Sequence, residues 1–222
     1  MKMPNTTRFT SPMQRRTAWE NIGAGISTLA ATAALFAALV APRAAHAVDE
    51  SVWADLAKVG KLEANFEQTQ TRAVLKQPLV SRGVVRYDRG TASLLWQVVS
   101  PGASTFSLVG TVAKMEYPDL GMKDTFDLAQ VPEASRLASS LLVWMQADAA
   151  AVSRDFDTTY GTDSATLRPK DPTLRGLLSE LQIRFASAPT RVRSVDLVEP
   201  DADRVHIAFR GVRLDGVATT DP

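Results

Sequence analysis

The hydrophobic positions that follow Gly60 alternate with polar ones in a way that predicts consecutive β-strands. In the first run, Leu62, Ala64 and Phe66 fall on one face of an extended chain, and the residues between them are polar. Pro78 then interrupts the chain, and residues 83–87 form a second run that ends at an Asp-Arg-Gly turn. These patterns predict half-buried strands joined by short turns.

A third strand is predicted over residues 94–99, and it is apolar on both faces. Leu94, Trp96 and Val98 share one face, and Leu95 and Val99 share the other. A strand of this kind is typical of a sheet that is covered on both sides. We therefore expect a cover over each face of this part of the sheet.

The remaining patterns predict more strands and little helix. Strands are expected at residues 105–109, 112–117, 154–160, 165–168, 181–186, 192–199 and 204–210, with a last short one at 211–214. Residues 49–59 have helical spacing, residues 174–178 predict a helical turn, and the polar residues 120–130 predict a loop. The sum of about ten strands favours one mainly antiparallel sheet with a little helix against it.

A helix is also predicted from Pro132 to about Ala149, because a proline and an acid open its first turn. Its apolar residues cover too broad an arc for an ordinary surface helix; they include Leu137, Leu141, Trp144 and Met145. Two interpretations stay open. The helix is packed in the protein core, or it faces an apolar partner that is not protein.

Residues 1–47 have the features of a secretory signal peptide. Basic residues precede an apolar run over residues 22–40, and Ala45-His46-Ala47 supplies small residues for cleavage. A membrane anchor is the alternative, but glycines and alanines make the run only weakly hydrophobic. We expect cleavage after Ala47, a single mature domain over residues 48–222 and a location in the periplasm. Arg15-Arg16 leaves both general and twin-arginine export open.

Removing this leader reverses the sign of the net charge. The leader holds five of the 25 Lys and Arg and one of the 24 Asp and Glu, which leaves 20 basic against 23 acidic residues. An interspersed, slightly acidic surface argues against a nucleic-acid partner. The chain has no cysteine, so neither a disulfide nor a thiolate metal site is available.

The residues that commonly carry catalysis are few. His206 is the only histidine after the leader, it lies in an alternating strand, and no Gly-x-Ser-x-Gly motif or phosphate-binding loop accompanies it. Asp155 and Asp157 begin a run like a calcium loop, but the glycine and the final acid that such a loop needs are missing. The sequence therefore favours binding over catalysis, and we expect no enzyme activity, no cofactor and no metal.

Several short motifs follow one another in the order found in the LolA-type outer-membrane lipoprotein carriers. The chain resembles this family in Phe66-x-Gln68, Gly83 to Tyr87, Leu95-Trp96 and Tyr117-Pro118, and later in Leu167-x-Pro169-Lys170 and the hairpin over 192–210. Residues 75–83 and 94–96 look similar to a divergent branch of the family, whose members tend to be associated with acyltransferases and lipid exporters. The resemblance covers nearly all of the mature chain.

This resemblance implies an open, incomplete antiparallel β-barrel of about ten to eleven strands, with helices forming a lid over a hydrophobic cavity. The cavity is expected to be lined by the large apolar residues of the strands and of the broad helix: Phe66, Leu95, Trp96, Phe106, Leu108, Met115, Tyr117, Leu137, Leu141, Trp144 and Met145. By position, Arg89 matches a family arginine that holds the lid closed. The following Gly90-Thr91-Ala92 replaces the usual proline and lengthens this loop.

The implied function is a periplasmic carrier that shields the acyl chains of a lipoprotein between an inner-membrane exporter and an outer-membrane acceptor. The divergent branch suggests another lipid-like cargo, such as a polyene or a glycolipid. We expect a monomer. Two alternatives remain: a lipid-sensing interaction domain of the same fold, and an exported hydrolase that uses His206. The same large apolar side chains would form plain core if nothing is bound.

Overall fold

The computed structural model describes residues 48–130, 147–187 and 189–220, and they form one antiparallel sheet with a few short helices. The strands are β1 (Lys61–Thr71), β2 (Leu79–Asp88), β3 (Ser93–Ser100), β4 (Ser104–Val109), β5 (Val112–Tyr117), β6 (Met122–Asp127), β7 (Phe156–Tyr160), β8 (Ser164–Pro169), β9 (Glu180–Ala186), β10 (Arg191–Val198), β11 (Arg204–Leu214) and β12 (Val217–Ala218). The α-helices are α2 (Ser51–Ala57), α4 (Ala149–Asp155) and α5 (Pro172–Arg175).

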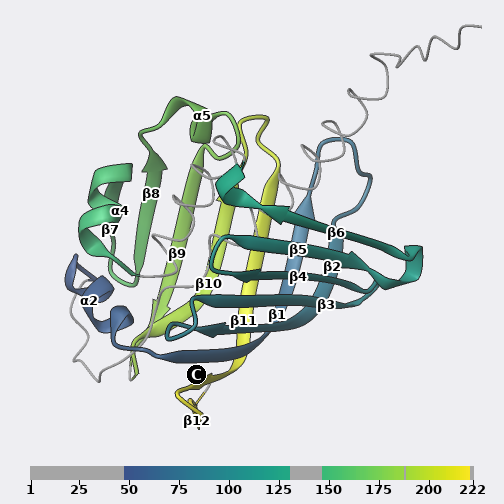
Figure 1. Cartoon of the computed structure of the whole chain (residues 1–222). Coiled ribbons are helices and arrows are strands. Elements are labelled where there is room, and N and C mark those ends of the chain that lie inside the picture. Colours follow the sequence, from purple (N-terminus) through teal and green to yellow (C-terminus); the bar gives the residue numbers. More distant parts are fainter. Residues whose placement is uncertain (1–47, 131–146, 188, 221–222) are drawn as a thin grey trace, which may run out of the picture.

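The sheet is open. Its strand order is β6-β5-β4-β3-β2-β1-β11-β10-β9-β8-β7, and β12 pairs with β11 outside this path. The sheet curves, so that β4–β6 pass in front of β10 and β11 and cross them at a steep angle (Figure 1). Because β6 and β7 are the two ends of the order and do not pair with each other, the barrel is incomplete, which confirms the expected fold class.

Strand β1 links the two halves of the sheet, since it pairs with β2 on one side and with β11 on the other. Its alternating pattern buries every second residue from Leu62 to Gln70. This buried face continues across the neighbouring strands, and we call it the inner face. The register shifts at one point in each of three strand pairs, a feature that bends a sheet locally.

The described helices lie against the β7–β8 end of the sheet (Figure 1). Helix α2 buries Val52, Trp53 and Leu56, and the indole nitrogen of Trp53 donates a 2.8 Å hydrogen bond to the Tyr160 hydroxyl on β7. The side chain of Asp148 caps α4 by accepting from the Ala151 amide. Asp171 caps α5 in the same way, since its side chain accepts from the Leu174 amide.

The structure corrects three predictions of secondary structure. Residues 122–127 form strand β6 where a loop was expected, because an edge strand with polar side chains has no apolar alternation. Residues 154–155 end helix α4 and do not begin a strand. Residues 211–214 continue β11 through Gly211, whose positive φ of 58° lets the strand bend without ending.

The other predicted elements are confirmed within a few residues at their ends. Strand β5 has the predicted bounds, and the expected helical turn is α5, which begins two residues earlier than predicted. The predicted signal peptide, and the predicted broad helix as far as residue 146, lie outside the described residues, and Ala149 starts α4.

Candidate functional site

The candidate site is the inner face of β1–β5, where strand pairing sets the apolar side chains in rows. We call the row that contains Trp96 the Trp96 row. It runs directly across five strands and consists of Ala64, Val85, Trp96, Phe106 and Met115. A neighbouring row contains Leu62, Tyr87, Leu94, Leu108 and Ala113. The register therefore gathers residues that are spread over fifty positions of the sequence into one apolar surface.

Trp96 is the centre of an aromatic group that joins the two halves of the sheet. Its ring stacks on that of Phe66, with centroids 4.1 Å apart and planes inclined by 27°. It also meets the ring of Phe209 on β11 edge-on, at 6.5 Å. Both arrangements are favourable for aromatic pairs. They bring β3 against β1 and β11 across the curved interior.

Most of the strand residues predicted to line a cavity lie on this inner face. Phe66, Trp96, Leu108 and Met115 are buried, and Phe106 and Tyr117 are half-buried. The structure therefore places these six side chains on one surface. Whether this surface binds a ligand stays a prediction.

Leu95 does not share this surface. It pairs with Arg86 on β2 and Ser107 on β4, so it belongs to the opposite, outer face of the sheet. Val99, on the same outer face, is 57% exposed. The prediction that β3 is covered on both sides is wrong at this end of the strand. The remaining predicted cavity residues, Leu137, Leu141, Trp144 and Met145, lie outside the described residues.

Arg89, the predicted lid latch, contacts the end of helix α2. Its Nε donates a 2.8 Å hydrogen bond to the Val59 carbonyl, and a terminal nitrogen donates to the Leu56 carbonyl at 3.3 Å. The guanidinium also lies 5.8 Å from the centre of the Tyr87 ring. These contacts satisfy carbonyls at a helix C-terminus, where a positive charge is favourable. The latch role stays a prediction.

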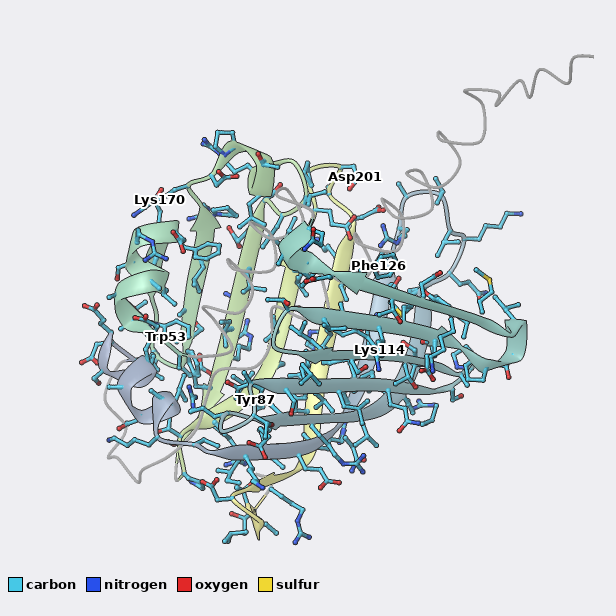
Figure 2. The ribbon with its side chains drawn as sticks, in the orientation of Figure 1. Trp53, Tyr87, Lys114, Phe126, Lys170 and Asp201 are labelled. Carbon is cyan, nitrogen blue, oxygen red and sulfur yellow. The ribbon has the colours of Figure 1, made fainter. Side chains whose placement is uncertain are left out.

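Tyr87 lies beside this arginine, in the row next to Trp96 (Figure 2). Its side chain is 8% exposed, and burial raises the pKa of its phenol above the ordinary value of 10.0. The positive charge of Arg89 opposes this shift. Tyr87 is therefore a neutral, largely apolar part of the inner face at physiological pH.

His206, the candidate for hydrolysis, lies on the outer face of β11. Its Nδ1 is 2.7 Å from a carboxylate oxygen of Asp196 on β10, and both side chains are more than one third exposed. This pair is opposite Thr69 on β1, away from the apolar rows. The geometry is that of a surface pair on a strand, as the alternating sequence predicts.

An acidic group lies at the end of the β10–β11 hairpin, where Asp201 is labelled in Figure 2. It comprises Glu199, Asp201 and Asp203, and Arg72 contacts two of them, with Nη1 at 3.1 Å from both Glu199 and Asp203. Burial lowers the pKa of Arg72, but the hydrogen bonds and charges of these carboxylates outweigh it and raise the pKa overall. The positive charge of the Arg72 guanidinium therefore balances part of the negative charge of these carboxylates.

The inner face also carries a polar patch that was not predicted from the sequence. Gln68, Gln70 and Ser81 are at most 8% exposed, and Ser81 lies directly opposite Gln68 in the β1–β2 pair. Within the described part of the chain, the Oε1 atom of Gln68 has no hydrogen-bond partner. The signal was present in the sequence, since Gln68 and Gln70 continue the every-second-residue pattern that contains Phe66.

In the described part of the chain, no helix combines the length and the hydrophobicity that crossing a membrane requires. No curated protein matches the chain.

Comparison with solved structures finds several proteins at low sequence identity. A LolA superfamily protein from Nitrosomonas europaea is 9% identical, with 74% of this chain and 89% of that chain covered and a TM-score of 0.36. A DUF1329 family protein from Desulfovibrio piger is 10% identical, with 75% and 91% covered and a TM-score of 0.41. The Mycobacterium tuberculosis lipoprotein LppX is 9% identical, with 74% and 91% covered and a TM-score of 0.41.

A family model assigns the chain to a protein family. The model described as outer membrane lipoprotein carrier protein LolA-like matches residues 28–220, which is most of the chain and includes every strand. The chain belongs to the LolA-like family of outer-membrane lipoprotein carrier proteins.

Proposed function

We propose that this protein is a periplasmic carrier that binds the acyl chains of a lipoprotein or lipid-like cargo on the inner face of its sheet. It shields these chains from water during transfer from an inner-membrane exporter to an outer-membrane acceptor. Family membership supports this proposal. The observation that carries it is the apolar inner face, on which rows of aromatic and aliphatic side chains run across β1–β5.

Acyl chains need such a surface because water excludes them. Each exposed methylene costs roughly 0.8 kcal/mol, so a chain of sixteen carbons costs about 12 kcal/mol in water. A carrier must offset most of this cost and still release its cargo. Contacts with apolar side chains are non-directional, which allows a flexible chain to bind in several positions.

The open sheet supports the same proposal. Since β6 and β7 do not pair with each other, hydrogen bonding does not fix the separation of the two halves of the sheet. The half-buried Phe106 and Tyr117 and the adaptable Met115 lie on the half formed by β2–β6. Cargo of different width can then be accommodated by a change in curvature.

The experiment uses the mature chain, residues 48–222, purified gently from the periplasm. Native mass spectrometry and lipid extraction of one sample identify co-purifying acylated species, and fluorescent fatty acid measures uptake. Phe106→Glu places a charge on the inner face and is expected to abolish uptake. Leu95→Glu is the matched control, because Leu95 is also half-buried but lies on the outer face of the adjacent strand.

Transfer from donor to acceptor vesicles then separates a carrier from a lipid sensor, because a sensor takes up lipid without delivering it. A wild-type protein that has a clean apo mass and takes up no fatty acid would refute the proposal. Equal uptake by the Phe106→Glu and Leu95→Glu variants, with circular dichroism showing that both are folded, would place binding elsewhere than the inner face.

A further inference from the structure

The side chain of Gln68 is in an unusual position for an amide. It is 3% exposed, and its Oε1 atom has no hydrogen-bond partner among the residues that the structure describes. A buried carbonyl of this kind loses its hydrogen bonds to water on folding and gains none in return. A folded protein retains such a group at a cost, and a ligand that supplies a hydrogen-bond donor removes that cost.

On two sides, the neighbours of Gln68 belong to the apolar surface. Phe66, two residues earlier on the same face, stacks on Trp96, and Ile207 lies directly opposite Gln68 on β11. Both Phe66 and Ile207 are buried. The amide therefore borders the aromatic group on one side and the aliphatic side chains of β11 on the other.

Two further polar residues adjoin Gln68 on the inner face. Ser81 lies opposite it on β2, and Gln70 follows it on the same face of β1; both are less than one tenth exposed. These three residues form a small polar patch, which we call the Gln68 subsite. It adjoins the aromatic and aliphatic side chains of the inner face.

We propose that the Gln68 subsite binds a hydrogen-bond donor carried by the acyl ligand, namely a hydroxyl group or an amide N–H. The inference rests on the proposed function, since it specifies the chemistry of a ligand bound on the inner face. Oε1 of Gln68 accepts the hydrogen bond, and the apolar surroundings strengthen it by excluding water. Such a donor comes either from a hydroxylated acyl chain or from an amide-linked one.

The test compares ligands that carry this donor with one that lacks it. The mature protein is titrated with hexadecanoic acid, with hexadecanoic acids that carry one hydroxyl at different positions, and with N-hexadecanoylglycine, each competing against a fluorescent fatty acid. At least one donor-bearing ligand is expected to bind about tenfold more tightly than hexadecanoic acid, which is about 1.4 kcal/mol. Preference for a hydroxylated acid identifies the chain as the source of the donor, and preference for the amide identifies the linkage.

Two variants assign this preference to Gln68. Gln68→Leu keeps the size of the side chain and removes its acceptor, so it is expected to bind all ligands equally and to unfold at no lower temperature than wild type. Gln68→Met is the second variant, used if Gln68→Leu does not fold. Gln97→Leu makes the same change on the outer face of β3, opposite Thr105 on β4, and is expected to retain the preference.

Each outcome has a separate meaning. Tight but equal binding of all ligands by the wild type overturns the Gln68 subsite and leaves the carrier function standing. A preference that persists in Gln68→Leu or Gln68→Met also overturns the subsite. Binding of no ligand at all overturns both the carrier function and the subsite.

Discussion

At the scale of single residues, the loop between β2 and β3 shows how one side chain connects two elements. Arg89 donates to the Val59 and Leu56 carbonyls at the end of α2 and lies near the Tyr87 ring. Carbonyls at a helix end that lose a charged donor lose a hydrogen bond of above-average strength. Arg89 therefore holds the end of α2 to the β2–β3 loop.

Arg89→Ala is therefore expected to destabilise the protein by about 1–3 kcal/mol. Urea unfolding of the mature chain measures this value. Arg82→Ala is the control, because Arg82 lies on β2, the strand that precedes Arg89, but is 64% exposed, and its ion pair with Glu67 is worth at most about 1 kcal/mol. Equal losses in the two variants would show that the contacts of Arg89 with α2 do not stabilise the fold.

Tyr87 gives a prediction for alkaline pH. Burial raises the pKa of its phenol in the folded state above the ordinary value of 10.0. As the pH rises, the phenol of the unfolded chain therefore ionises before that of the folded chain. The free energy of unfolding is not reduced by Tyr87 below about pH 10, and it falls as the pH rises from there through the folded pKa.

The wild type is thus expected to lose stability above about pH 10, and Tyr87→Phe is expected to lose less. Thermal melting between pH 7 and pH 11 checks this prediction. Part of the decline remains in the variant, because burial also raises the pKa of Tyr160. Parallel curves for wild type and variant would contradict the assignment to Tyr87.

At the scale of elements, the β2–β3 pair depends on the absence of a side chain at Gly83. A Cβ atom there would lie 1.9 Å from the Gln97 carbonyl oxygen and 2.6 Å from the Phe66 ring. The register of this pair also shifts between Arg82 and Gly83. A glycine is needed here for the close approach of two strands beneath an aromatic stack.

Gly83→Ala is expected to destabilise the protein by roughly 3 kcal/mol, since neither a backbone carbonyl nor a stacked ring can move away cheaply. Gly102→Ala serves as the control, because a Cβ atom at Gly102 has open space within 4 Å, and it is expected to change stability by less than about 0.5 kcal/mol. Chemical denaturation of both variants measures the difference. Similar midpoints for the two would mean that β2 and β3 separate to admit the methyl group.

The elements that the sequence predicts well are those with one apolar face, such as β1 and β5. Strand β6 escapes prediction because Met122, Lys123, Asp124 and Thr125 are all exposed and show no alternation. Leu95 was expected to line the cavity together with Trp96, although the alternation of strand residues already put the two on opposite faces, as the structure has them. Which residues of different strands lie opposite each other depends on register, and a single sequence does not give it.

At the scale of the whole molecule, the β1–β2 and β10–β11 hairpins are joined at one end by Arg72. This residue pairs with Glu199 and Asp203, and the Ala73 amide donates a 2.8 Å hydrogen bond to Asp203. Strands β1 and β11 already pair along the length of β1, so these contacts add to that pairing and hold the loop after β1 against the β10–β11 turn.

Asp203→Ala is expected to cost about 2 kcal/mol, because it leaves a partly buried guanidinium short of one partner and a backbone amide without its acceptor. Asp201→Ala, in the same turn but exposed, is expected to cost less than half as much. Thermal unfolding of both variants provides the comparison. A larger loss of stability in Asp201→Ala than in Asp203→Ala would mean that the conformation of the turn stabilises the protein more than the contact with Arg72 does.

The open sheet has a further consequence at its β6 end. In the described part of the chain β6 pairs only with β5, so its other side is a row of backbone groups that a strand of another molecule would fit. Exposed charges at Lys123, Asp124 and Asp127 oppose such pairing. The polar residues that make β6 hard to predict from the sequence are thus the ones that disfavour aggregation through its edge. An open sheet needs such residues at its edge strand, because pairing with the edge of another copy would otherwise be favourable.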